Sequence, residues 1–275
     1  MKRLKILICT IMRNQTQNIS RWYNQLELLI KLCPEYDFVV SVYENDSTDD
    51  TKRMLKVMAE HGDIPVILGT EDIRTNFYGS VWSEERLRNL ANARQKCIDQ
   101  VGKLDNFDKI AFIEPDIEYD PNWCKELILA NHPRLARFYP DVYSAWSIRS
   151  NKIPKESCFL YDTCATRQEE SDKTWDFEKW EVSGRTNSLI QTHISDVDSN
   201  CLHKVYSTFN CFCVYNAEPF KRGLKWGYIN KTLDTGQKKF ENGWLDSDTA
   251  VICEDFREMG YGNIVLNTNC LVRHL

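Results

Sequence analysis

The stretch Asp108-Lys109-Ile110-Ala111-Phe112-Ile113-Glu114-Pro115-Asp116-Ile117-Glu118-Tyr119-Asp120-Pro121 joins an apolar run directly to a cluster of carboxylates. The run 109–113 predicts a central strand covered on both faces, and Pro115 would end its ladder because it has no N–H to donate. Open α/β sheets bind their ligands at the carboxyl ends of such strands. Glu114 and Asp116 flank one residue, a spacing that can present carboxylate oxygens to a divalent cation. A polar loop without a metal is the alternative interpretation.

The composition favours one α/β domain rather than several. The chain has 275 residues, of which 42% are hydrophobic, and no Pro/Gly/Ser-rich linker or internal repeat interrupts it. The formal charge is −5 and the basic residues are scattered, which argues against a nucleic-acid partner and against a polybasic membrane patch. Acids gathered at one place would suit a metal better.

The eleven cysteines form no CxxC pair and no metal-finger spacing. Reduced thiols that act as small core residues are the favoured interpretation, and Cys211 and Cys213 are expected to share one face of a strand. The first apolar run, 4–11, is too short and wrongly flanked for a signal peptide or a membrane span. We therefore expect no transmembrane segment and a cytoplasmic location.

The first part of the chain alternates strands and helices. Apolar runs predict strands, and apolar residues at helical spacing predict helices that begin near Asn18, Ser47 and Ser83; the strands lie at 4–11, 38–43, 64–68 and 109–113. This order predicts a right-handed, doubly wound parallel sheet that binds a nucleotide at its carboxyl edge.

The second part is less regular. It predicts a helix over 122–130, a helix from Ser247 to Met259 with Gly260 at its end, and strands at 143–148, 208–215, 264–266 and 271–274. A long polar and aromatic region separates the first two of these strands. Irregular stretches of this kind often carry the substrate side of a site.

The segment Tyr43-Glu44-Asn45-Asp46-Ser47-Thr48-Asp49-Asp50-Thr51 resembles the nucleotide-side signature of GT-A glycosyltransferases. It is most similar to that of the cryptococcal alpha-1,3-mannosyltransferase family, glycosyltransferase family 69. Further blocks agree in order: Arg86 with Arg94, Phe107-Asp108-Lys109 with Asp116, Tyr161-Asp162-Thr163 with Arg167, Phe209-Asn210-Cys211 through Ala217-Glu218-Pro219-Phe220, and Ser247-Asp248. Two departures are the missing N-terminal anchor of the fungal members and Asp rather than Glu at position 248.

The resemblance implies a single GT-A domain over 1–275, with a mostly parallel, Rossmann-like sheet flanked by helices. Residues 1–121 would form the nucleotide-binding half, and 122–275 an irregular acceptor-binding half. It also implies a divalent metal, Mn²⁺ or Mg²⁺, held by Asp116 and by His274, because GT-A enzymes resemble one another in supplying a late His near the metal. A solvated His near the terminus is the alternative.

Five residues are candidates for binding the donor. Glu114 would complete the acid pair beside the metal, and Glu44 ends a strand where this fold reads the base or ribose. Glu44 and Asp46 have an alternative role as caps of the next helix, which we prefer for Asp46. Arg86 and Arg94 would offer guanidinium forks to the diphosphate, unless they are solvated helix residues. Arg167, with Asp162, would contact the donor sugar or the acceptor.

Two acids are candidates for catalysis. Asp248, just inside a helix, would orient or deprotonate the acceptor hydroxyl, and a helix cap is its alternative role. Asp162 is the second, whereas Asp255 is assigned to structure. Trp175 and Trp180 would stack on a sugar, unless they belong to the core.

The sequence therefore predicts a metal-dependent glycosyltransferase that moves a sugar from a nucleotide-diphosphate donor to a hydroxyl of a glycan or glycoconjugate acceptor. The resemblance implies retention of configuration and GDP-mannose as donor. A UDP-sugar such as UDP-xylose is the alternative donor for an unanchored member. Two other classes remain open: a non-catalytic nucleotide- or glycan-binding module, and a sugar nucleotidyltransferase, which the absence of Gly from 10–17 disfavours.

Overall fold

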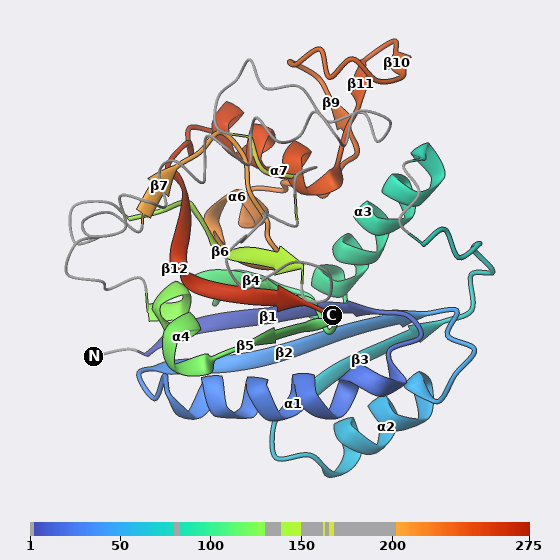
Figure 1. Cartoon of the computed structure of the whole chain (residues 1–275), viewed down its shortest axis with the longest axis vertical. Helices are drawn as coiled ribbons and strands as arrows, with labels where there is room; N and C mark the ends of the chain where they lie inside the picture. The colour runs from blue at the N-terminus through green and yellow to red at the C-terminus, as the bar shows by residue number, and fades with distance from the viewer. Residues whose placement is uncertain (1–2, 80–82, 130–138, 150–161, 163–164, 168–201) are drawn as a thin grey trace.

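A central mixed sheet organises the chain. The computed structural model describes residues 3–79, 83–129, 139–149, 162, 165–167 and 202–275. The strand order is β3-β2-β1-β4-β8-β6-β12-β5, with β7 paired to β12 (Figure 1). The strands are β1 (Leu4–Met12), β2 (Tyr36–Asn45), β3 (Val66–Glu71), β4 (Lys109–Ile113), β5 (Ile117–Tyr119), β6 (Val142–Arg149), β7 (Leu202–Lys204), β8 (Phe212–Asn216) and β12 (Ile264–His274).

The first four strands run parallel, as the sequence predicts. Ile8 lies opposite Val40 of β2 on one side and Ala111 of β4 on the other. Along β1 the buried side chains alternate between the two hydrophobic clusters, with Ile8 in one and Leu7 in the other. β1 is therefore covered on both faces, which explains why it reads as a continuous apolar run.

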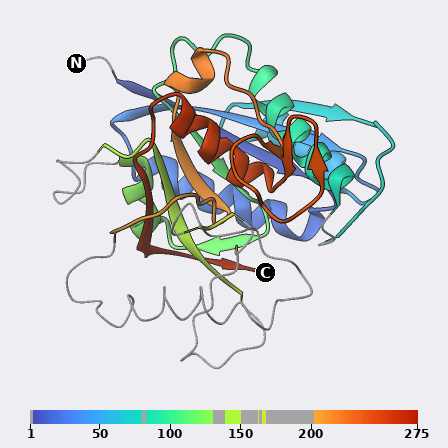
Figure 2. The same ribbon diagram turned by 90° about the horizontal axis from the view of Figure 1, so that it is seen from above.

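Helices cover both faces of the sheet (Figures 1 and 2). α1 (Thr16–Lys31), α2 (Thr51–His61) and α4 (Pro121–Leu129) pack on one face, and α3 (Glu84–Asp99), α6 (Glu218–Lys221) and α7 (Asp248–Glu258) on the other. The buried residues of α1 recur at helical spacing: Ile19, Trp22, Leu26 and Leu29. This arrangement confirms the predicted α/β class.

The second half of the chain extends the same sheet. β8 runs antiparallel to β4 and β6, and β12 runs parallel to β6 before it pairs with β5. The division at residue 121 stays a prediction. A small sheet of β9 (Ile229–Asn230), β10 (Lys239–Phe240) and β11 (Gly243–Leu245) lies beyond α7 (Figure 1).

The structure corrects four of the expectations for this part of the fold and for α2. β8 begins at Phe212, not at 208, because Asn210 and Cys211 adopt left-handed backbone conformations, with φ 53° and 62°. Cys211 and Cys213 consequently lie in different hydrophobic clusters and share no face. Ser47 does not begin α2; its Oγ accepts a hydrogen bond from the Asn14 N–H instead. The two final predicted strands form one, β12, interrupted by a bulge.

The described cysteines and Gly260 lie as the sequence analysis expects. Every cysteine among them is buried and free of disulfides, as expected for core thiols. None of the helices in these ranges has the length and apolar character needed to cross a membrane. Gly260 follows α7 with φ 88°, the left-handed conformation of a helix-ending glycine.

Candidate active site

A cavity of about 370 Å³ opens at the carboxyl edge of the parallel strands. Segments after β1, β2, β3 and β4, together with the first turns of α3 and the end of β12, form its wall. Four of the predicted site residues line it: Arg86, Glu114, Asp116 and His274. These residues come from three distant parts of the chain, and the tertiary structure brings them to one cavity.

Asp116 and His274 lie side by side in this cavity. The Nε2 atom of His274 is 3.2 Å from Oδ2 of Asp116. Backbone pairing holds them there, since His274 lies opposite Ile117 in the β12–β5 ladder and the Leu275 N–H donates to the Asp116 carbonyl. The strand pairing therefore decides that the last imidazole of the chain meets the acid that follows the central strand.

The side chains of Asp116 and His274 could supply two of the ligands of a divalent cation. Oδ1 of Asp116 is buried and accepts no hydrogen bond from the described residues. A buried carboxylate oxygen normally has a partner, and a bound cation could be the partner of this one. No group of three or more His, Cys, Asp and Glu side chains in the described ranges is arranged to hold a metal. A cation here would take its other ligands from water and from a phosphorylated ligand, as Mg²⁺-type sites commonly do.

Behind the cavity wall, Arg94 links two acids of the predicted site. Its Nη2 donates to Oε1 of Glu114 at 2.9 Å, and its Nη1 donates to Oδ2 of Asp248. The guanidinium also lies over the rings of Phe209 and Trp226, 4.7 and 5.3 Å from their centroids. Arg94 and Asp248 are only 3% and 2% exposed.

The electrostatics of this layer favour a charged arginine. Burial alone would lower the pKa of Arg94, but the carboxylates of Asp248 and Glu114 outweigh it and raise that pKa. Burial and the neighbouring charge of Asp116 raise the pKa of Glu114. Arg94 thus joins α3, the end of β4 and the first turn of α7, and the spacing of Arg94 alone did not indicate this buried role.

Asp162 lies against the same layer. Its Oδ2 accepts from the Asn210 N–H at 2.9 Å, and burial raises the pKa of its carboxyl. Arg94 and Asp248 are both close enough to influence that pKa. Asp162 therefore belongs with the Arg94 layer rather than with the open cavity. Tyr161, Thr163, Trp175 and Trp180 lie outside the described residues.

Arg86 lines the cavity from the first turn of α3. The Ser83 hydroxyl caps this helix by accepting from the Arg86 N–H, and Nε of Arg86 donates to the Gly79 carbonyl at 2.9 Å. The guanidinium is thereby held between the helix start and the loop after β3. It influences the pKa of Asp248 and so adds positive charge to this side of the site.

Glu44 and Arg167 do not line the cavity. Glu44 is fully buried, and its Oε1 accepts from the Ser47 N–H at 2.8 Å. This bond holds the turn after β2 and does not cap α2, which begins at Thr51. Arg167 is 2% exposed and donates to both carboxylate oxygens of the buried Asp246, at 2.7 and 2.8 Å. Asp246 also accepts from Asn230, so Arg167 ties the chain before β7 to the small sheet.

Sequence reasoning missed the loop that forms one wall of the cavity. Asp46 does not cap α2; it accepts from the N–H groups of Arg74 and Thr75 and from the Thr75 hydroxyl. Partial burial opposes ionisation, but these hydrogen bonds hold the pKa of Asp46 well below its usual range. Arg13 donates to the carbonyls of Thr75 and Asn76. The polar and aromatic run after the third strand is the feature of the sequence that could have indicated this loop.

Solved structures of two other proteins are similar to this fold. S. aureus TarS 1–349, solved in complex with UDP-GlcNAc, has a TM-score of 0.50 and 11% identity; the match covers 98% of this chain and 58% of that one. The mannosyltransferase PcManGT from Pyrobaculum calidifontis, in complex with GDP-Man and Mn²⁺, has a TM-score of 0.47 and 12% identity, over 98% of this chain and 56% of that one. The fold is the predicted glycosyltransferase fold.

The family can be stated more closely. The model of the family described as cryptococcal mannosyltransferase 1 matches residues 5–255, so the chain belongs to this family of glycosyltransferases. The resemblance carried by the sequence blocks is thereby confirmed. No curated protein is similar enough in sequence to count as a match.

Proposed function

We propose that the chain is a metal-dependent glycosyltransferase that moves a sugar from a nucleotide-diphosphate donor to a hydroxyl of a glycan acceptor. The observation that carries the proposal is the contact between Asp116 and His274 in a cavity at the carboxyl edge of the parallel strands. Family membership supplies the reaction class and favours GDP-mannose as the donor. A UDP-sugar such as UDP-xylose is the alternative donor.

In this proposal, the residues at the cavity bind two different groups, the metal and the diphosphate. Asp116 and His274 would hold Mn²⁺ or Mg²⁺, which supplies charge neutralisation for a departing diphosphate. Arg86 faces the same cavity from a helix N-terminus and would bind the diphosphate through its guanidinium. The N-terminal end of α3 adds a favourable dipole for anions there.

The buried layer behind the cavity positions these groups. Arg94 is already bonded to Glu114 and Asp248, so in our proposal it orients Glu114 beside Asp116 rather than binding the diphosphate itself. Asp248 is 2% exposed and does not line the cavity, which suits it poorly to take a proton from an acceptor hydroxyl. This supports transfer with retention, in which the leaving phosphate takes that proton.

Nucleotide-dependent stabilisation tests the proposal. We expect GDP with Mn²⁺ to raise the Tm of the full chain more than GDP alone, and UDP and CMP with and without Mn²⁺ identify the preferred base. Hydrolysis of the matching sugar nucleotides then identifies the donor. Asp116→Asn should abolish the Mn²⁺-dependent part of the increase in Tm. Asp37→Asn, at the end of β2 away from the cavity, should leave that part unchanged.

The outcomes separate the three classes of protein. Stabilisation by nucleoside triphosphates alone would instead identify a nucleotidyltransferase. Nucleotide binding without any turnover of sugar nucleotides, with or without added glycans, would identify a non-catalytic binding module. A chain that Mn²⁺ and all nucleotides leave unchanged would contradict the proposed site.

A further inference from the structure

Two neighbouring residues just before β8 have a backbone conformation that side chains disfavour. Asn210 and Cys211 have φ angles of 53° and 62°, in the left-handed region that glycine adopts readily. Asparagine tolerates this region, whereas cysteine has no preference for it. Strained residues of this kind persist where their surroundings fix them, and they are concentrated at functional sites. We call residues 210–211 the left-handed turn.

The side chain of Asn210 anchors the turn in a buried network of hydroxyl groups. Its Nδ2 donates to the hydroxyls of Thr208 and Thr166, at 2.8 and 3.2 Å, and its Oδ1 accepts from the Ser147 hydroxyl at 2.8 Å. Asn210 is fully buried. Its backbone N–H donates to Oδ2 of Asp162 at 2.9 Å, so the network fixes a donor to this carboxylate.

The carbonyl of Cys211 holds the start of the segment that carries the proposed metal ligand. It accepts from the Glu114 N–H at 2.9 Å, directly beyond the end of the β4–β8 ladder. Burial raises the pKa of the Cys211 thiol, and the carboxylates of Glu114 and Asp162 raise it further. Asp116 adds to the same effect. Three acids of the proposed site therefore surround this one residue.

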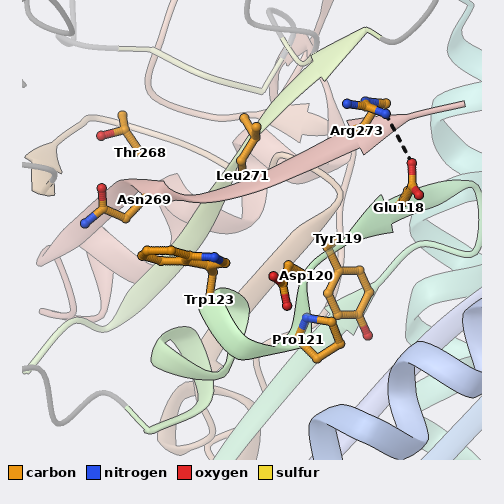
Figure 3. Close-up of a pocket in the computed structure, with 9 residues that line it drawn as sticks. All are labelled: Glu118, Tyr119, Asp120, Pro121, Trp123, Thr268, Asn269, Leu271 and Arg273. Carbon is orange, nitrogen blue, oxygen red and sulfur yellow. Dashed lines mark hydrogen bonds and ion pairs between the residues drawn. The ribbon is translucent and has the colours of Figure 1, made fainter.

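The segment 114–116 is held separately at its other end. The Leu275 N–H donates to the Asp116 carbonyl. In the β5–β12 ladder that follows, Glu118 lies opposite Arg273, and their side chains form an ion pair of 3.3 Å (Figure 3). Sheet pairing thus fixes the segment on one side, and the left-handed turn fixes it on the other.

A side chain at position 211 makes the turn rigid. A residue with a Cβ atom has only a small left-handed well, whereas glycine moves between several regions of backbone conformation. The Cys211 carbonyl is therefore held in one direction as long as this residue is not glycine.

We propose that the left-handed turn is a positioning element of the transfer reaction, which rests on the proposed function. It fixes the backbone of Glu114, and with it the proposed metal ligand Asp116, and it orients the carboxylate of Asp162. Neither residue of the turn lines the cavity, so the turn acts through these acids.

Paired substitutions at position 211 of the full chain test this role. Cys211→Ala and Cys211→Gly both remove the thiol, but only alanine keeps the small left-handed well. Glycine relieves the strained φ, so we expect the Tm of Cys211→Gly to be about 2–4 °C above that of Cys211→Ala. By contrast, kcat for the preferred sugar nucleotide should be about tenfold lower in Cys211→Gly, because Asp116 is held less precisely. KM for this donor should agree within about threefold, since the cavity wall is unchanged.

The same pair of substitutions at Cys213 is the control. Cys213 lies within β8, where the backbone is extended. Cys213→Gly should therefore be less stable than Cys213→Ala, and the two variants should have equal kcat.

The outcomes distinguish positioning from a purely structural role. A structural role predicts that the more stable of the two Cys211 variants is at least as active as the other. Equal kcat in Cys211→Gly and Cys211→Ala, whether unchanged or reduced alike, would show that the turn does not position the acids. A lower Tm for Cys211→Gly would show that residue 211 is not strained. An original chain without turnover and without nucleotide-dependent stabilisation would instead contradict the proposed function.

Discussion

The guanidinium of Arg94 lies between the carboxylates of Glu114 and Asp248, which come from two other parts of the fold. Both carboxylates are held in place by this one side chain. It bonds to Glu114 after β4 and to Asp248 in α7, in surroundings that exclude water. A charge in such a position is tolerated because its partners are equally fixed, and removal of one partner leaves the others uncompensated. The function of Arg94 is consequently inseparable from the stability of the layer.

Replacement of Arg94 by leucine should destabilise the chain by about 3–5 kcal/mol, because two largely buried carboxylates lose their cation. Arg94→Lys should cost less, since one positive charge remains without the planar fork. Urea unfolding measures both variants. Arg88→Leu, at an exposed position of the same helix, is the matched control, and an equal loss in both leucine variants would show that the paired carboxylates do not matter.

Asp255 provides a pH-dependent test at a residue assigned to structure. Burial raises its pKa from 3.8 to about 6, although Lys231 lies 3.9 Å away. The folded chain therefore binds more protons than the unfolded chain between these values, and the stability that this carboxyl contributes is lost as pH rises through 6. The increase in the free energy of unfolding that Asp255→Asn gives over the original chain should therefore be about 1 kcal/mol larger at pH 8 than at pH 5.

Unfolding by urea at the two pH values measures this difference. The matched change Asp105→Asn, at an exposed position, is the control. A gain from Asp255→Asn that is the same at both pH values would show that the carboxyl does not titrate with a raised pKa.

At the scale of elements, the loop after β3 depends on side chains from neighbouring loops. Asp46 bonds to the backbone of Arg74 and Thr75, and Arg13 reaches the same loop from the end of β1. These contacts replace the backbone hydrogen bonds that a regular element would have. The wall of the cavity at the carboxyl edge of the parallel strands is therefore built from hydrogen bonds between loops, which secondary-structure propensity does not describe.

Asp46→Ala should weaken nucleotide binding about tenfold and lower the unfolding free energy by about 1–3 kcal/mol, because several backbone and hydroxyl donors lose their acceptor. Titration with the preferred nucleotide and urea unfolding measure the two effects. Asp50→Ala removes an exposed acid that pairs with Arg53 in the next turn, and it should affect neither quantity strongly. Unchanged nucleotide affinity in Asp46→Ala would show that this loop does not bind the donor.

At the scale of the whole molecule, β12 carries the chain from α7 back to the central strand. It pairs with β6 on one side from Ile264 to His274, and on the other side with β7 near its start and with β5 at its end, and so places His274 beside Asp116. The two residues are far apart in sequence, but each is fixed by a backbone ladder. The metal site we propose is therefore a product of sheet topology.

A double-mutant cycle checks this arrangement. His274→Ala and Asp116→Asn should each remove the Mn²⁺-dependent stabilisation by nucleotide, and the double variant should lose no more than either single variant, because both act at one cation. His61→Ala, an exposed histidine at the end of α2, is the control. Additive effects of the two changes on Mn²⁺ binding would separate the residues into independent sites.

Much of the fold could be predicted because its signals are local. The predicted strands at 109–113 and 143–148, and the helical spacing of Trp22 and Leu26, reflect burial that shows as a local pattern in the sequence. The cavity pairing of Asp116 and His274 was expected from a family resemblance rather than from local pattern. The left-handed Asn210 and Cys211 could not be read in this way, since neither is glycine and both occupy an apparently regular strand pattern.

The sequence by itself determined the four parallel strands, the helices between them, the acids at the end of the central strand and the family to which the chain belongs. Only the tertiary structure decided that Arg94 is bonded to Glu114 and Asp248, and that Asp46 holds the loop after β3. The physical reason is that periodic burial is recorded locally, whereas a partner for a buried charge is set by which strands and helices pack together.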